Sequence, residues 1–251
     1  MPRTRVGYVA RMPGTGIGAR LGAAGTAPFG AALTAWAYLW RITPVHRHEQ
    51  DGSPADDLPA RLPANASRDE LQLPEDGAGP LLHRTYTGVL NGAERSAEEL
   101  ISWIGEDPNR VVPLALARFK KTRGEPWRLT VGDEFQIRIL APWDGPVRVV
   151  EVTPTSFRFA TLQGHLEAGQ IEWRSFERDG RLVFQIDSRA RAGDRFSSVL
   201  HDVLPMAKEV QLHMWTSVIE RVARKAGAKL EGGVDVQTRR IDADAFAGGS
   251  E

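Results

Sequence analysis

Residues 195–226 read RFSSVLHDVLPMAKEVQLHMWTSVIERVARKA and carry the pattern that decides the fold. Apolar side chains recur every three or four positions, which predicts one long amphipathic helix of roughly 45 Å. The positions of this apolar stripe are Val199, Val203, Ala207, Val210, Met214, Val218 and Val222. Basic residues come just before Gly227, as is typical of a helix C-terminus. Pro205 predicts a kink or a break in this helix.

The residues before this helix predict an antiparallel meander with one apolar face. Apolar and polar residues alternate in successive short runs, and Asp179-Gly180 is a typical hairpin dipeptide. The apolar positions of these runs are Phe135, Ile137, Ile139, Phe157, Phe159, Trp173, Phe184 and Ile186. Because this face and the helical stripe are both apolar, we expect them to pack against each other.

A strand and two short helices are predicted ahead of the meander. Residues 81–90 alternate as a strand, and Ser96 with Glu99 forms a capping box at the start of a helix. Residues 111–124 predict a second, partly irregular helix. The chain therefore shows one strand, two short helices, an antiparallel meander and a long C-terminal helix, which is an α+β arrangement.

This order of elements resembles that of the START-related superfamily, also called SRPBCC, whose helix-grip fold wraps a curved antiparallel sheet around the last helix. At the residue level, SFRFATLQGHLEAGQIEW, from Ser156 to Trp173, resembles the signature of an uncharacterised family named domain of unknown function number nineteen-ninety. Both show a phenylalanine-rich strand, a Gly-His-x-Glu-x-Gly turn and a second strand. The resemblance covers residues 81–228 and implies a helix-grip fold. It implies no reaction, and Gln170 stands where an acid is usual.

Composition excludes several classes of function. Hydrophobic residues make up 41% of the 251 residues and charged residues 25%, which is typical of a folded globular protein. The absence of cysteine excludes disulfides, thiolate catalysis and cysteine-based metal sites. Thirty-two basic residues balance 32 acidic ones, so we expect no nucleic acid partner.

The remaining segments are assigned from their composition. Residues 1–48 predict a basic N-terminal segment, with a short apolar helix at Ala31 to Arg41. Residues 49–80 predict an acidic, proline-rich linker, and residues 229–251 a flexible C-terminal tail. The uncharged stretch 21–40 is rich in alanine and glycine, so we expect no membrane insertion. We expect a cytoplasmic, bacterial-type protein; no oligomeric state follows from the sequence.

Two local groups of residues suggest chemistry. Gly164 and Gly169 permit a tight turn that would hold His165 beside Glu167, and an imidazole oriented by a carboxylate can transfer protons. The alternative is an ordinary hairpin turn with solvated side chains. Arg118, Lys120, Lys121 and Arg123 surround Phe119, and we interpret them as a solvated helix end, with phosphate contact as the alternative. We expect no bound metal and no cofactor.

The predicted architecture favours a cavity between the sheet and the long helix. The expected ligand-binding side chains are Phe135, Ile137, Phe157, Phe159, Trp173, Phe184, Val203, Met206, Val210 and Met214. Our first hypothesis is a protein that binds a small hydrophobic or amphipathic molecule there. The second is an enzyme on the same scaffold that uses His165 and Glu167. The third is a structural or interaction module with a filled core, in which Trp36 and Trp40 contact a partner.

Overall fold

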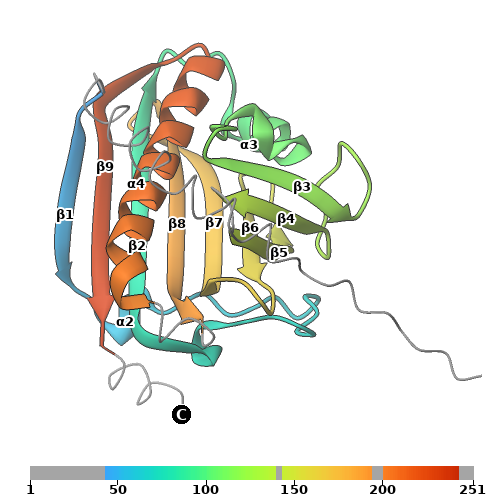
Figure 1. Cartoon of the computed structure of the whole chain (residues 1–251). Helices are drawn as coiled ribbons and strands as arrows, with labels where there is room; N and C mark the ends of the chain where they lie inside the picture. The colour runs from blue at the N-terminus through green and yellow to red at the C-terminus, as the bar shows by residue number, and fades with distance from the viewer. Residues whose placement is uncertain (1–42, 140–142, 194–199, 243–251) are drawn as a thin grey trace, which may run out of the picture.

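The structure is a computed structural model that describes residues 43–139, 143–193 and 200–242, with the backbone alone at 143, 144 and 200–208. One nine-stranded sheet curves around a long helix (Figure 1). The strands, in the order in which they lie side by side, are β1 (Val45–Asp51), β9 (Lys229–Ile241), β2 (Gly77–Asn91), β8 (Arg181–Gly193), β7 (Glu167–Arg178), β6 (Ser156–Thr161), β5 (Trp143–Val152), β4 (Glu134–Ile139) and β3 (Ala117–Arg123). Only β1 and β9 pair in parallel within these described ranges.

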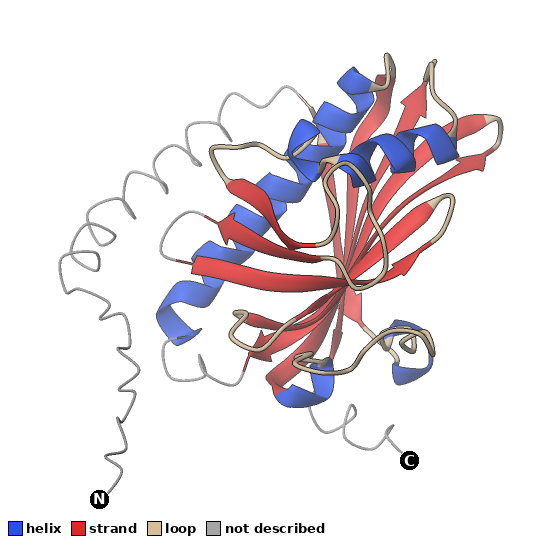
Figure 2. Cartoon of the chain, turned by 90° about the vertical axis from the view of Figure 1, so that its right-hand side faces the viewer, coloured by secondary structure: helices blue, strands red, loops and turns tan. Residues whose placement is uncertain are grey.

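Two helices cover the concave face of the sheet. The long helix α4 (Leu200–Lys225) packs on β2, β8 and β9, and α3 (Ala97–Glu106) packs on β6 and β7. Figure 2 shows α4 running along one side of the twisted sheet. The predicted capping box is confirmed, because Ser96 and Glu99 exchange hydrogen bonds at the start of α3. Helix α4 continues through Pro205, so the predicted break is wrong.

The core lies between the concave face and these helices. Tyr86, Ile186 and Trp173 lie opposite one another on β2, β8 and β7, and all are at most 1% exposed. Each such burial stabilises the fold by about 1.5–3 kcal/mol. Gly88 brings β2 close to α4, because a Cβ atom at this position would lie 2.4 Å from Cγ2 of Ile219.

The predictions of a linker at residues 49–80 and of a flexible tail at residues 229–251 are wrong for most of these ranges. Within residues 49–80 the structure has the end of β1, helix α2 (Pro54–Asp57), the short turn η1 (Pro74–Asp76) and the start of β2. Residues 53–76, which we call the strap, cross the convex face of the sheet and bury Leu71 and Leu73. Residues 229–241 form β9, which joins β1 to β2. The strap has an acidic, proline-rich composition because most of its residues stay exposed or half-buried on the surface of the sheet.

The second predicted helix is also wrong. After α3 and the turn η2 (Pro108–Arg110), the chain forms β3. The Asn109 side chain accepts from the amide of Phe119 and donates to its carbonyl, each at 2.8 Å, which holds the start of β3. Ala117 and Phe119 are buried while Arg118 and Lys120 are exposed, which is the period of a strand.

None of the helices among the described residues is long and apolar enough to cross a membrane. The predicted helix Ala31 to Arg41 and the tryptophans Trp36 and Trp40 lie outside the described residues.

Candidate functional site

A polar cluster lies on the concave face beneath α4. It consists of Arg84 and Tyr86 on β2, Glu167 at the start of β7, and Gln211 on α4. The Gln211 amide donates to both carboxylate oxygens of Glu167, at 3.3 and 3.2 Å, and its own oxygen accepts from the Arg84 guanidinium. The amide of Gln211 therefore bridges two opposite charges beneath α4.

Tyr86 lies within the electrostatic field of this cluster. Burial raises the pKa of Tyr86 to about 12; the negative charge of Glu167 acts in the same direction and the positive charge of Arg84 opposes it. The hydroxyl therefore keeps its proton at neutral pH and can donate a hydrogen bond.

The predicted ligand-binding residues whose side chains the structure describes lie on the expected face, but most of them pack on one another. Phe135, Ile137, Phe157, Phe159, Trp173, Phe184 and Met214 are all buried in one core cluster. The rings of Phe157 and Phe159 are 5.5 Å apart, and those of Trp173 and Trp215 are 5.7 Å apart. Val210 is half-buried on α4. Val203 and Met206 belong to α4, but their side chains lie outside the described part.

His165 and Glu167 do not form the predicted pair of functional groups. The Nδ1 atom of His165 accepts from the main-chain amide of Glu167 at 2.9 Å, whereas the Glu167 carboxylate contacts Gln211. Burial lowers the pKa of His165, although the Glu167 charge opposes the shift, so the ring is neutral at neutral pH. The ring lies against Gly145, where a Cβ atom would be 2.5 Å from Nε2. His165 therefore braces the turn, and Glu167 belongs to the concave cluster.

The convex face holds a buried ionic array that the sequence analysis missed. His83 on β2 lies between Asp57 of the strap, 2.6 Å from Nδ1, and Asp187 on β8, 2.9 Å from Nε2. Both ring nitrogens of His83 thus lie within hydrogen-bond distance of a carboxylate. All three side chains are at most 5% exposed. No sequence pattern indicated this array, because Asp57 falls in the predicted linker.

A small pocket adjoins this array on the same face. It has a volume of about 20 Å³ and is lined by Pro59, Ala60, Arg158, Gln170, Glu172, Asp187 and Arg189. The volume suits about one water molecule. The Nε atoms of Arg158 and Arg189 and the Oε1 atom of Gln170 are buried there without a hydrogen-bond partner. Because this pocket on the convex face has room for only about one water molecule, we place the candidate site on the concave face, where the polar cluster meets apolar residues.

A curved, mostly antiparallel sheet wrapped around one long helix defines an α+β protein of the helix-grip class. Residues 94–221 match the family DUF1990, described as a domain of unknown function, and the chain belongs to this family.

Several solved structures are similar to the chain. The di-domain ARO/CYC StfQ from the steffimycin biosynthetic pathway is 13% identical, with a TM-score of 0.45; the match covers 61% of this chain and 52% of that one. The chain thus spans about half the length of StfQ. The Zhui aromatase/cyclase from a Streptomyces species is 16% identical, with a TM-score of 0.41 and coverages of 59% and 94%. A point mutant of Thalictrum flavum norcoclaurine synthase is 10% identical, with a TM-score of 0.39 and coverages of 59% and 97%. No curated protein matches.

Proposed function

We propose that the protein binds a small amphipathic molecule between the sheet and α4. The polar end of the molecule would contact the cluster of Arg84, Glu167 and Gln211, and its apolar part would lie along Ile171. The observation that carries the proposal is the pair of opposite charges, Arg84 and Glu167, that Gln211 of α4 bridges on the concave face of the sheet.

The energetics of the cluster support this proposal. Burying charged groups costs free energy unless other groups compensate for the lost water. Arg84 and Glu167 are both half-buried, and each is held by the neutral amide of Gln211. A guanidinium has five donors and a carboxylate about four acceptor positions. The cluster thus retains hydrogen-bonding capacity that suits a polar ligand group.

The adjoining surface supports an apolar contact. Ile171 lies next to Ser188 on β8 and Phe159 on β6, on the same face as Arg84. Phe159 is buried, but Ile171 remains half-exposed while packing against the core. An amphipathic molecule can place its apolar part against Ile171 while its polar end forms hydrogen bonds with the cluster.

The test compares uptake of two fluorescent probes, the anionic anilinonaphthalene sulfonate and the neutral phenylnaphthylamine. We expect roughly micromolar affinity for both, about 8 kcal/mol. Replacing Arg84 with methionine keeps the length of the side chain and removes its charge. Arg84→Met should weaken sulfonate binding by about tenfold or more and leave the neutral probe unaffected, since hydrogen bonds to charged groups contribute about 1.5–3 kcal/mol.

A matched pair of variants on β7 locates the site. Ile171→Trp should reduce the uptake of both probes, because it fills the concave face. Glu172→Gln changes the next residue, on the opposite face, and should have no effect. Absence of uptake by the folded parent protein would contradict the proposal and favour a structural module.

A further inference from the structure

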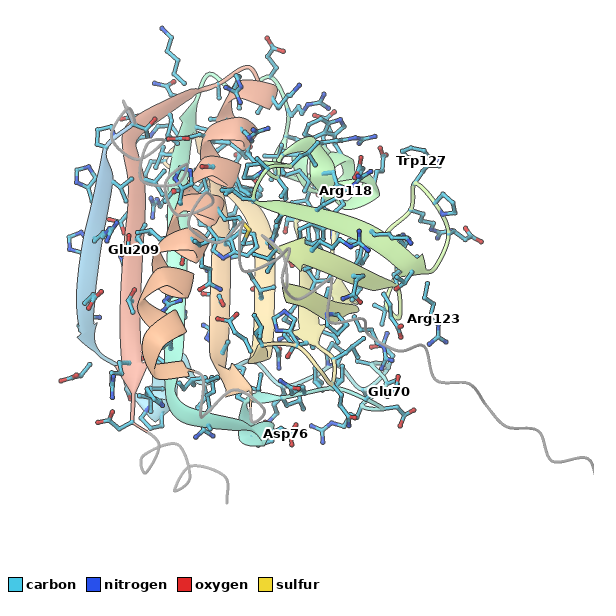
Figure 3. All side chains as sticks on the ribbon, viewed as in Figure 1. Glu70, Asp76, Arg118, Arg123, Trp127 and Glu209 are labelled. Carbon is cyan, nitrogen blue, oxygen red and sulfur yellow. The ribbon has the colours of Figure 1, made fainter. Side chains whose placement is uncertain are left out.

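The loop that joins β3 to β4 displays an exposed tryptophan. Trp127 is 72% exposed and has a φ of 63°, in the left-handed region that bulky residues rarely adopt. Figure 3 shows Trp127 together with Arg118 and Arg123 on the side of the molecule farthest from β1. The loop thus accepts backbone strain while it holds a large apolar ring in solvent.

Buried polar groups brace this loop from below. The Lys121 ammonium donates to the carbonyls of Glu125 and Arg128 and lies 2.7 Å from the Asp133 carboxylate. Asp133 also accepts from the amide and the hydroxyl of Thr130, at 3.0 and 2.9 Å. The conformation that exposes Trp127 is therefore specified by a hydrogen-bond network. Strain that is maintained in this way indicates a function.

The surface around Trp127 is basic. The exposed basic residues of β3 and the loop are Arg118, Lys120, Arg123 and Arg128, while Glu125 is the exposed acid. Arg123 lies 3.4 Å from Glu134 but stays 69% exposed. β3 ends the strand order of the described sheet, and charged side chains on such an edge prevent pairing with other chains. That role explains Arg118 and Lys120, but it does not explain an exposed tryptophan.

We propose that this surface, defined by Trp127 and the four basic residues, docks on an anionic lipid membrane. Indole rings favour the membrane–water interface, and basic side chains near it attract anionic headgroups. A single ring on a projecting loop forms no groove for a peptide, but it can enter a planar interface. The basic residues beside it complement the charge of the membrane. Docking of this kind is peripheral and needs no membrane-spanning segment, and it goes beyond the proposed ligand binding.

Co-sedimentation with vesicles tests this proposal on the full chain. We expect binding to vesicles of phosphatidylcholine with phosphatidylserine, weaker binding to phosphatidylcholine alone, and release by salt. Trp127→Gly should raise the Kd for the anionic vesicles by about tenfold or more. Arg128→Gln should raise it by about fivefold. Leu114→Ala, which alters an exposed leucine ahead of β3, should leave binding unchanged.

A stability measurement separates loss of docking from loss of folding. Glycine adopts positive φ without strain, so Trp127→Gly should unfold at the same or a higher temperature than the parent. Equal vesicle binding by the parent and Trp127→Gly would overturn the proposal and point to another basic part of the chain. Absence of binding to the anionic vesicles would also overturn it and favour a protein partner for Trp127.

Discussion

The Nδ1 atom of His83 lies 2.6 Å from Oδ1 of Asp57, and this contact attaches the strap to the convex face of the sheet. Asp57 is fixed from the other side by the main-chain amide of Ser53, at 2.8 Å. Asp187 on β8 holds the second nitrogen of His83. The ring of His83 thus connects a segment near residue 57 with two neighbouring strands of the sheet.

Stability should fall in acid because of this array. Burial tends to raise the pKa of Asp57 and of Asp187, but hydrogen bonds and positive charges, chiefly from His83, outweigh it and hold both below the ordinary value of 3.8. A carboxyl group with a lowered pKa in the folded state stabilises the protein above its unfolded pKa. This contribution should be lost as the pH falls below 3.8 toward the folded values. Urea unfolding across this range measures it.

The variant Asp57→Asn tests whether the array causes this loss. It should show a shallower decline of unfolding free energy in acid than the parent does. Asp56→Asn, at an exposed neighbour for which no contact to His83 exists, should keep the parental slope. Identical slopes for all three proteins would rule out the array as the cause.

Removing the imidazole should strongly destabilise the fold. His83→Ala leaves two buried carboxylates facing each other, and breaking a buried ion pair typically costs about 3–5 kcal/mol. The measurement is the free energy of unfolding in denaturant. The strap should also become sensitive to limited proteolysis, whereas in the parent it should resist cleavage. Rapid cleavage of the parent within residues 53–76 would contradict the described attachment.

Any larger side chain at position 88 should lower the stability of the fold. Its Cβ atom would lie 2.4 Å from Ile219, so Gly88→Ala should push α4 away from β2 at a cost of about 1–3 kcal/mol. Thermal unfolding of Gly88→Ala, of Ile219→Ala, which removes the Cγ2 atom, and of the double variant tests this. If the clash is the cause, the double variant should be less unstable than the sum of the single changes.

The stability of the turn at His165 should depend on the hydrogen bond and the packing of the imidazole ring, and not on proton transfer. His165→Ala leaves the Glu167 amide without its acceptor, which should cost about 1–3 kcal/mol. Gly145→Ala should be destabilising as well, because the added methyl group occupies the position of the ring. In the background of His165→Ala the same change should become nearly neutral. Denaturant unfolding of the four proteins measures this coupling.

The sequence predicted those elements whose pattern is local. The described part of the α4 stripe, the Ser96–Glu99 box and the strand that holds Phe157 and Phe159 depend on neighbouring residues alone, and the structure confirms them. The strands β1 and β9 could not be found in this way, because they are defined by pairing between residues such as Val45 and Val234. Their own apolar content is low, since the strap and α4 cover only part of them.

The candidate site was predicted only in part. Glu167 was selected for the glycine turn and does lie on the concave face, but its partner is Gln211, which has no motif. Arg84 and Tyr86 are spaced for one face of a strand, but the register with β8 and β7 places them across from Ile171 and Trp173. Only Gln211 of α4 links Arg84 to Glu167. The basic residues around Phe119 were assigned to a helix end, and their alternation in β3 explains why they form an exposed edge.

The position of β9 between β1 and β2 has a consequence for synthesis on the ribosome. β1 and β2 leave the exit tunnel long before β9, and neither can pair with the other because β9 belongs between them. Until residues 229–241 have been translated, β1 has no partner in the described sheet and one edge of β2 stays open. The nascent chain therefore exposes strand edges that chaperones or neighbouring nascent chains can engage, and the sheet closes only after residues 229–241 have been translated.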